Sequence, residues 1–174
     1  HTAGIPALTA TPTYAELKLQ PTSPAKRLPS LLSQPLEFTP GERMNYSNSG
    51  YVLLGVLIER VSGKRYGEFL QDALFKPLDM RDTGYDRNMV VLPRRAAGYS
   101  PSPTGPVNAP YIDMTVPYAA GALYSTAGDL LKWERGLFGG KVISAASLQK
   151  MTTPFKDDYA FGLLESRAGN RRAL

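Results

Sequence analysis

Cysteine is absent from this 174-residue chain, and histidine occurs once, at position 1. Without cysteine, the chain forms no disulfide, offers no thiolate nucleophile and gives a metal no sulfur ligand. A Ser-His-Asp triad needs an imidazole held in place by packing, and zinc hydrolase sites usually need two or three imidazoles. Because the one imidazole stands at the chain end, we expect neither kind of site, no bound metal and no cofactor.

Long apolar runs are also missing, and none approaches the roughly 18 residues that span a bilayer. The segment that starts at His1 has neither the basic region nor the apolar core of a signal peptide. We therefore expect no membrane span, while the compartment stays open because both cytosolic and exported proteins can lack cysteine. With 43% apolar and 20% charged residues, the composition is that of a folded globular protein, and the length suits one ordinary domain.

Clustered charge of one sign is missing as well, although the formal net charge is +5. A basic balance can indicate nucleic-acid binding, but the basic residues here are scattered along the chain, as at Lys26-Arg27, Arg94-Arg95, Arg167 and Arg171-Arg172. The sequence has no basic stripe with interleaved aromatic residues. A mildly cationic surface is the preferred interpretation, and no nucleic-acid partner is expected.

Hydrophobic periodicity predicts one dominant helix, at residues 49–62. Its apolar residues cover nearly all sides, which is typical of a buried helix. Gly55 in its middle costs about 1 kcal/mol of helix propensity, so it indicates close packing against a neighbouring element. Gly63 suits the left-handed position that ends many helices.

The other predicted elements are shorter. A second helix at 65–75 has one apolar face and ends before Pro77, and the proline-rich stretch 86–118 is expected to be a long loop. Further expected elements are a helix starting with a capping box at Thr13, a helix within 28–34, a helix starting with a capping box at Thr126, a helix capped by Ser144 and ending near Met151, and a strand at 159–164.

The sequence just before the dominant helix carries the pattern Tyr-x-Asn, as Tyr46-Ser47-Asn48. Taken alone this pattern is weak, because Ser47, Asn48 and Ser49 are also good N-cap residues for the helix that follows. A capping role and a chemical role for this segment are both open at this point.

Five segments, taken in order, resemble those of one enzyme family. They are HTAGIP at the start, PGERMNYSNSGYVLLG around Tyr46, YGEFLQDALFKPLDMRDTGYD in the second predicted helix, AAGALYSTAGDLLKW, and VISAASLQKMTTP. Their order and spacing resemble those of the serine β-lactamase-like and penicillin-binding-protein-like family, which includes class C β-lactamases, DD-peptidases and related carboxylesterases. The resemblance extends over essentially all 174 residues.

The resemblance implies a Ser-x-x-Lys nucleophile that forms an acyl-enzyme with a small-molecule ester, a β-lactam or a peptide substrate. Tyr46 matches the tyrosine that moves protons to and from this serine, and a nearby lysine ammonium favours the phenolate form of such a tyrosine. Asn48 matches the residue that donates an amide hydrogen bond to the substrate, and Ser47 fills the position between them. Gly121 and Ala122 match a segment that lines the substrate cleft, although small residues before a helix describe them equally well.

This chain lacks a credible match to the family's Ser-x-x-Lys nucleophile. In the family, Ser-x-x-Lys stands well before the segment that matches His1, so we expect the nucleophile upstream of this chain. Two literal matches occur, at Ser23–Lys26 and at Ser147–Lys150. Pro29 is expected to break a helix that follows the first match, and the second match stands after the Tyr-x-Asn element, in the wrong order. The family's third element, Lys-Thr-Gly or His-x-Gly, is absent and is expected beyond Leu174.

These features predict a mainly α-helical fold with long loops and little sheet, equivalent to the helical region of the β-lactamase/transpeptidase-like fold. Residues 1–174 are expected to be a single partial domain that lacks the N-terminal and C-terminal sheet portions. One side of the helix at 49–62 is then an exposed apolar patch, which predicts self-association or association with the missing portion. The predicted function is that of a serine acyl-hydrolase fragment, inactive by itself; the alternatives are a non-catalytic ligand- or partner-binding module of the same fold, or a basic interaction domain.

Overall fold

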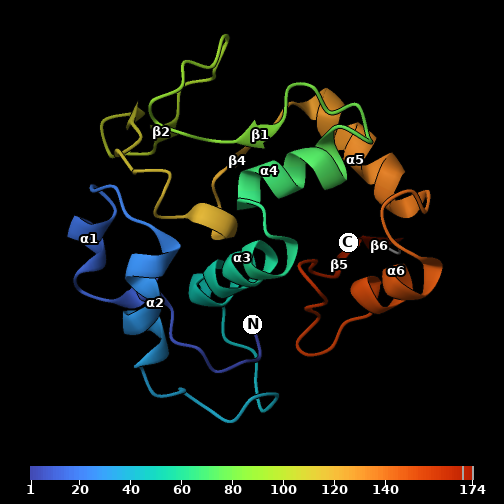
Figure 1. The fold of residues 1–174 in the computed structure, drawn as a ribbon, viewed down its shortest axis with the longest axis horizontal. Helices are drawn as coiled ribbons and strands as arrows, with labels where there is room; N and C mark the ends of the chain where they lie inside the picture. Colours follow the sequence, from blue (N-terminus) through green and yellow to red (C-terminus); the bar gives the residue numbers. More distant parts are fainter. Residues whose placement is uncertain (170, 174) are drawn as a thin grey trace.

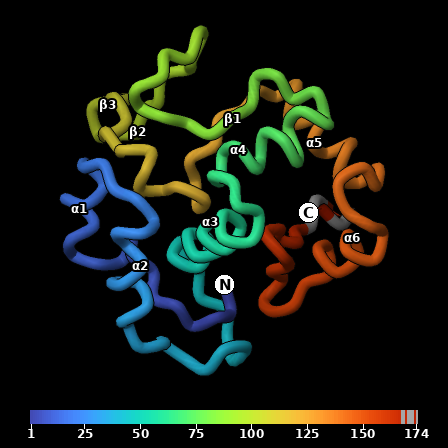
Figure 2. The backbone as a smooth tube through the Cα atoms, viewed as in Figure 1, coloured from blue at the N-terminus to red at the C-terminus, as the bar shows by residue number. Residues whose placement is uncertain are grey.

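The computed structural model describes residues 1–169 and 171–173, and it confirms a mainly α-helical fold with little sheet (Figure 1). The α-helices are α1 (Tyr14–Leu17), α2 (Pro24–Leu32), α3 (Asn48–Ser62), α4 (Tyr66–Leu70), α5 (Ala127–Phe138) and α6 (Ala145–Thr152). Short helical turns lie at η1 (Leu8–Ala10), η2 (Gln71–Phe75) and η3 (Tyr118–Ala120). In the tube view α3 lies in the middle, with α1 and α2 on one side and α6 on the other (Figure 2).

The described strands form three antiparallel pairs, each only two or three residues long. They are β1 (Gly84–Tyr85) with β4 (Leu123–Tyr124), β2 (Tyr99–Ser100) with β3 (Val107–Asn108), and β5 (Ser166–Ala168) with β6 (Arg171–Ala173). The first pair places Gly84 opposite Tyr124 and so joins the segment after α4 to the segment before α5.

The prediction of a strand at 159–164 is wrong. Tyr159 makes only isolated bridges, to Lys156 and to Leu164, and the strand begins at Ser166. Gly162 has a φ of 79°, which turns the chain away from the extended conformation that a strand needs. The apolar run therefore forms a turn rather than a sheet edge.

Helix α3 is the central element, and its ends follow the predicted signals. Ser47 caps its start by accepting a hydrogen bond from the Gly50 amide at 3.4 Å, and Gly63 ends it with a φ of 70°. Val52 is buried in the main core, together with Leu31, Tyr66, Leu70, Phe75, Met80 and Tyr118. The other side is open, because Leu54, Leu57 and Val61 are 51%, 54% and 79% exposed. The expectation that α3 is buried all round is therefore wrong for this side, whereas the expected apolar patch is present.

Gly55 sets the contact between α3 and η3. A Cβ atom at this position would lie 2.4 Å from the Cβ of Ala119 and 2.6 Å from a ring carbon of Tyr118. Real Cβ atoms do not approach so closely, so only glycine lets the two elements meet without a shift. The predicted close packing at Gly55 is confirmed, and it places the segment after Pro117 beside the middle of α3.

Two of the predicted caps differ in the structure. Thr13 precedes α1 but makes no side-chain cap hydrogen bond. Thr126 accepts a hydrogen bond from the Asp129 amide at 3.2 Å, but the Asp129 carboxylate does not reach back, because it binds the segment before β1 instead. A reciprocal capping box is therefore absent at both places, and only α5 keeps its threonine cap.

Helix α2 also corrects a prediction, because it begins at Pro24 and continues through Pro29 to Leu32. A proline removes one helical hydrogen bond, and burial of Leu31 in the main core helps to offset that loss. The helix predicted at 65–75 is present in extent, but its second half, η2, is a π-helical turn.

Candidate active site

The Tyr-x-Asn segment is held by the first residues of the chain. The Asn45 amide donates to the carbonyl of His1 at 2.9 Å, and the Gly41 amide donates to the carbonyl of Thr2 at 2.7 Å. One turn further along, the Leu8 amide donates to the hydroxyl of Ser49 at 2.9 Å. The backbone on which Tyr46 is mounted is therefore fixed by contacts with residues about forty positions away in the sequence.

The His1 imidazole lies among three tyrosine rings. Its centroid is 4.2 Å from that of Tyr46, 5.0 Å from that of Tyr51 and 4.8 Å from that of Tyr159. The Ser47 amide donates to His1 Nδ1 at 3.1 Å, which requires that this nitrogen carries no proton. The His1 imidazole is therefore held by packing, although it stands at the chain end.

The Tyr46 side chain is 52% exposed, although one face of its ring rests on His1. The neighbouring tyrosines are more enclosed. Burial, with smaller effects from Tyr159 and Tyr46, raises the pKa of Tyr51. Burial, with a smaller effect from Tyr46, also raises the pKa of Tyr159. Within this group of tyrosines Tyr46 has the phenol that a reacting group can approach from solvent.

Asn48 is the first residue of α3. It lines a cavity of about 150 Å³ together with Arg27, Ser49 and Val52. A separate cavity of about 280 Å³ is lined by His1, Ser47 and the exposed leucines of α3. The first turn of α3 therefore contributes residues to two separate cavities.

Gly121 and Ala122 follow η3 directly. Ala122 has no exposed surface, and its carbonyl accepts a hydrogen bond from the Asp86 amide at 2.8 Å. Gly121 is exposed. Of this predicted pair, Gly121 is the residue that a ligand can reach, whereas Ala122 packs against the interior.

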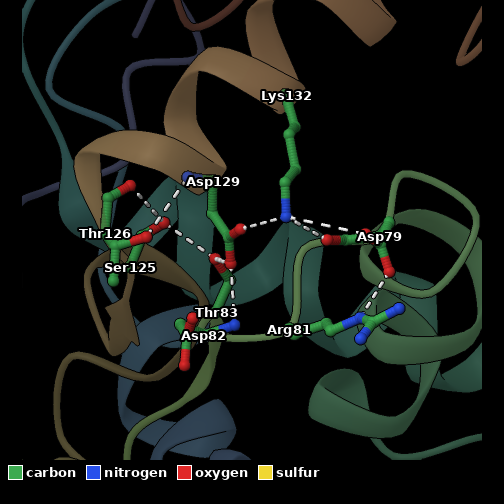
Figure 3. Close-up of polar contacts among 8 residues, drawn as sticks. All are labelled: Asp79, Arg81, Asp82, Thr83, Ser125, Thr126, Asp129 and Lys132. Atoms are coloured by element: carbon green, nitrogen blue, oxygen red, sulfur yellow. Dashed lines mark hydrogen bonds and ion pairs between the residues drawn. The ribbon is translucent and has the colours of Figure 1, made fainter.

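A dense polar network fixes α5 to the segment before β1 (Figure 3). One Asp129 oxygen accepts from the Asp82 amide at 2.8 Å and from the Thr83 hydroxyl at 2.9 Å, and the other accepts from Lys132 at 2.9 Å. Burial by itself raises the pKa of Asp129, but the hydrogen bonds from Lys132, Thr83 and the Asp82 amide outweigh it and lower that pKa. Ser125 joins the network by a 2.8 Å contact with Thr83.

The serines of both literal Ser-x-x-Lys matches lie at or near the start of a helix, where Ser23 is the N-cap of α2 and Ser147 is in the first turn of α6. The Ser23 hydroxyl accepts from the Lys26 amide at 3.3 Å and caps α2. The Ser147 amide donates to the Ser144 hydroxyl at 3.2 Å in the first turn of α6. Within the described residues, neither serine is hydrogen-bonded to Tyr46, so the structure does not join a nucleophile to the Tyr-x-Asn element.

Residues 1–169 and 171–173 contain no cluster of three or more histidine, aspartate or glutamate side chains with the spacing of a metal site. No helix in this described part is long and apolar enough to cross a membrane.

Sequence reasoning missed two residues at this site, His1 and Arg27. In the sequence, His1 was considered only as the single histidine, and Arg27 only as one of the scattered basic residues. The one usable signal for His1 was its place at the head of the HTAGIP segment, and no local signal marked Arg27, whose burial depends on the packing of α2 against α3.

Comparisons with known proteins identify the family to which the chain belongs. A family model described as Beta-lactamase matches residues 1–168. The mitochondrial serine beta-lactamase-like protein LACTB of Mus musculus is 38% identical over 109 residues, which are 62% of this chain and 20% of that protein.

Two solved structures share the fold over almost the whole chain. A D-stereospecific amidohydrolase from Streptomyces sp. superposes with a TM-score of 0.80 and 27% identity, covering 97% of this chain and 55% of the other. A D-amino acid amidase from Ochrobactrum anthropi SV3 superposes with a TM-score of 0.80 and 26% identity, covering 99% and 54%. The chain thus spans about half the length of these structures and a fifth of the length of LACTB. It belongs to the Beta-lactamase family, which groups serine β-lactamase-like and penicillin-binding-protein-like proteins.

Proposed function

We propose that this chain supplies the Tyr-x-Asn half of an acyl-serine hydrolase centre, with Tyr46 as the proton carrier and Asn48 as the amide donor to substrate. The observation that carries the proposal is the placement of Tyr46 and Asn48 at the entrance to α3. Tyr46 is half exposed on a ring support made by His1, and Asn48 begins the helix.

The proposed reaction needs a serine from a Ser-x-x-Lys segment, which we place in the parent protein upstream of His1. The serine oxygen attacks the substrate carbonyl while its proton moves to the Tyr46 phenolate. Tyr46 then returns the proton to the leaving group, and water hydrolyses the acyl-enzyme by the same route in reverse. A half-exposed phenol on a fixed backbone suits this role, because it can meet both the serine and the leaving group.

The substrate is an ester, a β-lactam or a peptide-like amide. The names of the two structural relatives, an amidohydrolase and an amidase that act on D-configured compounds, favour an amide beside a D-configured carbon. Gly121 is the residue after η3 that we propose to line the cleft.

The test compares the 174-residue chain with its longer parent. Nitrocefin, a p-nitrophenyl ester and a D-amino acid p-nitroanilide are the probes. The short chain should give no burst, whereas the parent should hydrolyse at least one probe.

In the parent, Tyr46→Phe should lower turnover by about 100-fold or more, the usual range for losing a positioned proton carrier. Tyr99→Phe is the matched control, because Tyr99 is a 65% exposed tyrosine in β2, and it should have no effect. Burst hydrolysis by the short chain that Tyr46→Phe abolishes would refute the need for an upstream serine. An inert parent would favour the alternative, a non-catalytic binding module of the same fold.

A further inference from the structure

The cavity beside Asn48 is lined by both polar and apolar side chains. It lies between α2, the first turn of α3 and the segment that leads into η3, and its volume is about 150 Å³. Its polar lining residues include Arg27, Asn48, Ser49, Thr9 and Tyr14, and its apolar lining residues include Leu31, Val52 and Val116. A cavity of this size is large enough to admit a small ligand.

Arg27 is a buried cation that has no counter-ion among residues 1–169 and 171–173. Its side chain is 5% exposed, yet within the described residues its guanidinium bonds only to neutral carbonyls, those of Val116 at 2.6 Å and Thr115 at 3.3 Å. Its Nε–H is buried and has no partner there. A buried charge is normally paired, because loss of hydration is costly when no opposite charge replaces it.

The electrostatic surroundings of Arg27 agree with this description. Burial is the largest influence and lowers the pKa of Arg27, and the groups that oppose it are three tyrosines, Tyr85, Tyr118 and Tyr14. No aspartate or glutamate contributes among these influences. Guanidinium carries five N–H donors, and the two carbonyls use only two of them.

The start of α3 adds positive potential to the same cavity. The first amides of a helix lack intrahelical partners and carry a partial positive charge, so they favour an anion. Asn48 and Ser49 are the first two residues of this 15-residue helix, and both line the cavity. The buried guanidinium and the helix start both line this cavity, and both favour an anion.

We propose that this cavity binds a small carboxylate, with Arg27 as its ion-pair partner, Asn48 as a neighbouring amide donor, and Leu31, Val52 and Val116 as contacts for a short apolar group. A carboxylate suits the site better than a neutral amide because it supplies the negative charge that Arg27 lacks among the described residues. Carboxylate binding at this site does not depend on the proposed catalytic activity. A role in catalysis does rest on the proposed function: the site would then hold the carboxylate end of a substrate or product next to Asn48.

The competing explanation is that Arg27 serves only to clamp the carbonyls of Thr115 and Val116. The two explanations differ in what the unmodified chain binds. Clamping alone predicts no preference between a carboxylate and the amide of the same shape.

The first experiment titrates the ¹⁵N-labelled chain with acetate and with acetamide, and with N-acetyl-D-alanine and its amide, at constant ionic strength. The Arg27 Nε–H signal and the Asn48 amide signal are followed by NMR. We expect saturable shifts for the carboxylates, with Kd on the order of 1–10 mM for ligands this small. The amides should bind about tenfold more weakly or worse, as expected for loss of a charged hydrogen-bond partner. Acetate alone binding would identify a free small anion as the ligand, and tighter binding of N-acetyl-D-alanine would identify the carboxylate end of a larger acyl amino acid.

The second experiment uses a matched pair on α2. Arg27→Gln should weaken carboxylate binding by about tenfold or more, while Lys26→Gln, which removes an exposed neighbouring cation, should change it by less than about twofold. Equal binding of carboxylate and amide by the unmodified chain would overturn the proposal, and so would equal losses in the two variants. The first comparison needs no variant, so it decides the matter even if Arg27→Gln fails to fold. Neither experiment depends on turnover, so the two proposals can fail separately. An inactive parent would refute the proposed function but not the carboxylate site. An active parent that binds no carboxylate would refute the carboxylate site but not the proposed function.

Discussion

The Asp129 network and the start of α3 are both polar, but their side chains face different surroundings. Asp129 is 2% exposed, and both of its carboxylate oxygens accept hydrogen bonds from the protein. At the start of α3, Tyr46 is 52% exposed and Arg27 is buried without an ion-pair partner in the described part of the chain.

This difference indicates that the Asp129 network maintains the fold, whereas the start of α3 is open to another molecule. A satisfied buried network stabilises one arrangement of the backbone, because every alternative leaves a buried group unpaired. Polar groups that the chain itself leaves unsatisfied are where a ligand, a substrate or another part of the protein gains most by binding. The apolar face of α3 at Leu54 and Leu57 belongs to the same open region.

The largest expected effect on stability comes from disrupting the Asp129 network. Asp129→Ala leaves the Asp82 amide and the Thr83 hydroxyl without their acceptor, and we expect a loss of about 3 kcal/mol in the free energy of unfolding. Asp72→Ala is the control, because the Asp72 side chain is 42% exposed and pairs with Lys64 and Lys76 at the surface, outside this network, and it should lower that free energy far less. Urea unfolding measures both. Equal losses would mean that the network does not hold the fold.

The same network predicts the pH dependence of that loss. Because the folded-state pKa of Asp129 is lowered, its stabilisation is present above the ordinary aspartate value and is lost as the pH falls through the lower folded-state value. The stability difference between the unmodified chain and Asp129→Asn should therefore be full above about pH 5 and should shrink below about pH 4. A difference that grows on acidification would contradict the assignment.

The next largest effect concerns the contact between α3 and η3. Gly55→Ala forces a Cβ atom to within 2.4 Å of Ala119, and we expect a loss of about 1–3 kcal/mol from overpacking. Gly50→Ala is the matched control in the same helix, because a Cβ there meets nothing within 4 Å. Thermal unfolding should show a lower Tm for Gly55→Ala only. A Gly55→Ala chain as stable as the control would mean that η3 moves freely against α3.

The sequence predicted the parts of the fold that depend on local pattern. Helix α3, its cap at Ser47 and its end at Gly63 follow from periodicity and short-range signals, which act over a few residues. The strand pair of Gly84 with Tyr124 and the bonds from Asp129 to the segment before β1 join residues about forty positions apart. Such long-range contacts cannot be predicted from local sequence patterns. The capping box therefore paired the Asp129 carboxylate with the start of its own helix, whereas the structure pairs it with the segment before β1.

The site shows the same limit in a sharper form. Tyr46 and Asn48 were found from a three-residue pattern and its neighbours, and the structure places both at the entrance to α3. His1 and Arg27 were not found, because their importance comes from what packs around them. A single histidine and a scattered arginine have no sequence pattern, and only the folded chain brings them to the Tyr-x-Asn segment.

The smallest expected effect on stability, and the most direct test of the open region, comes from His1. His1→Ala removes the ring under Tyr46 and the acceptor for the Ser47 amide, and we expect a loss of about 1 kcal/mol. The local effect should be larger than the global one, because the Tyr46 ring signals should sharpen toward those of a free side chain and the Ser47 amide should exchange faster in NMR.

Two further variants separate the roles of His1. His1→Phe keeps a ring but no acceptor, so it should retain the Tyr46 contact and lose protection of the Ser47 amide. His1→Asn offers a side-chain oxygen near the position of Nδ1, so it should protect the amide and free the ring. If His1→Ala leaves both the Tyr46 ring and the Ser47 amide unchanged, then His1 does not position the Tyr-x-Asn segment, and the pairing of Asn45 and Gly41 with the first two residues must do so alone.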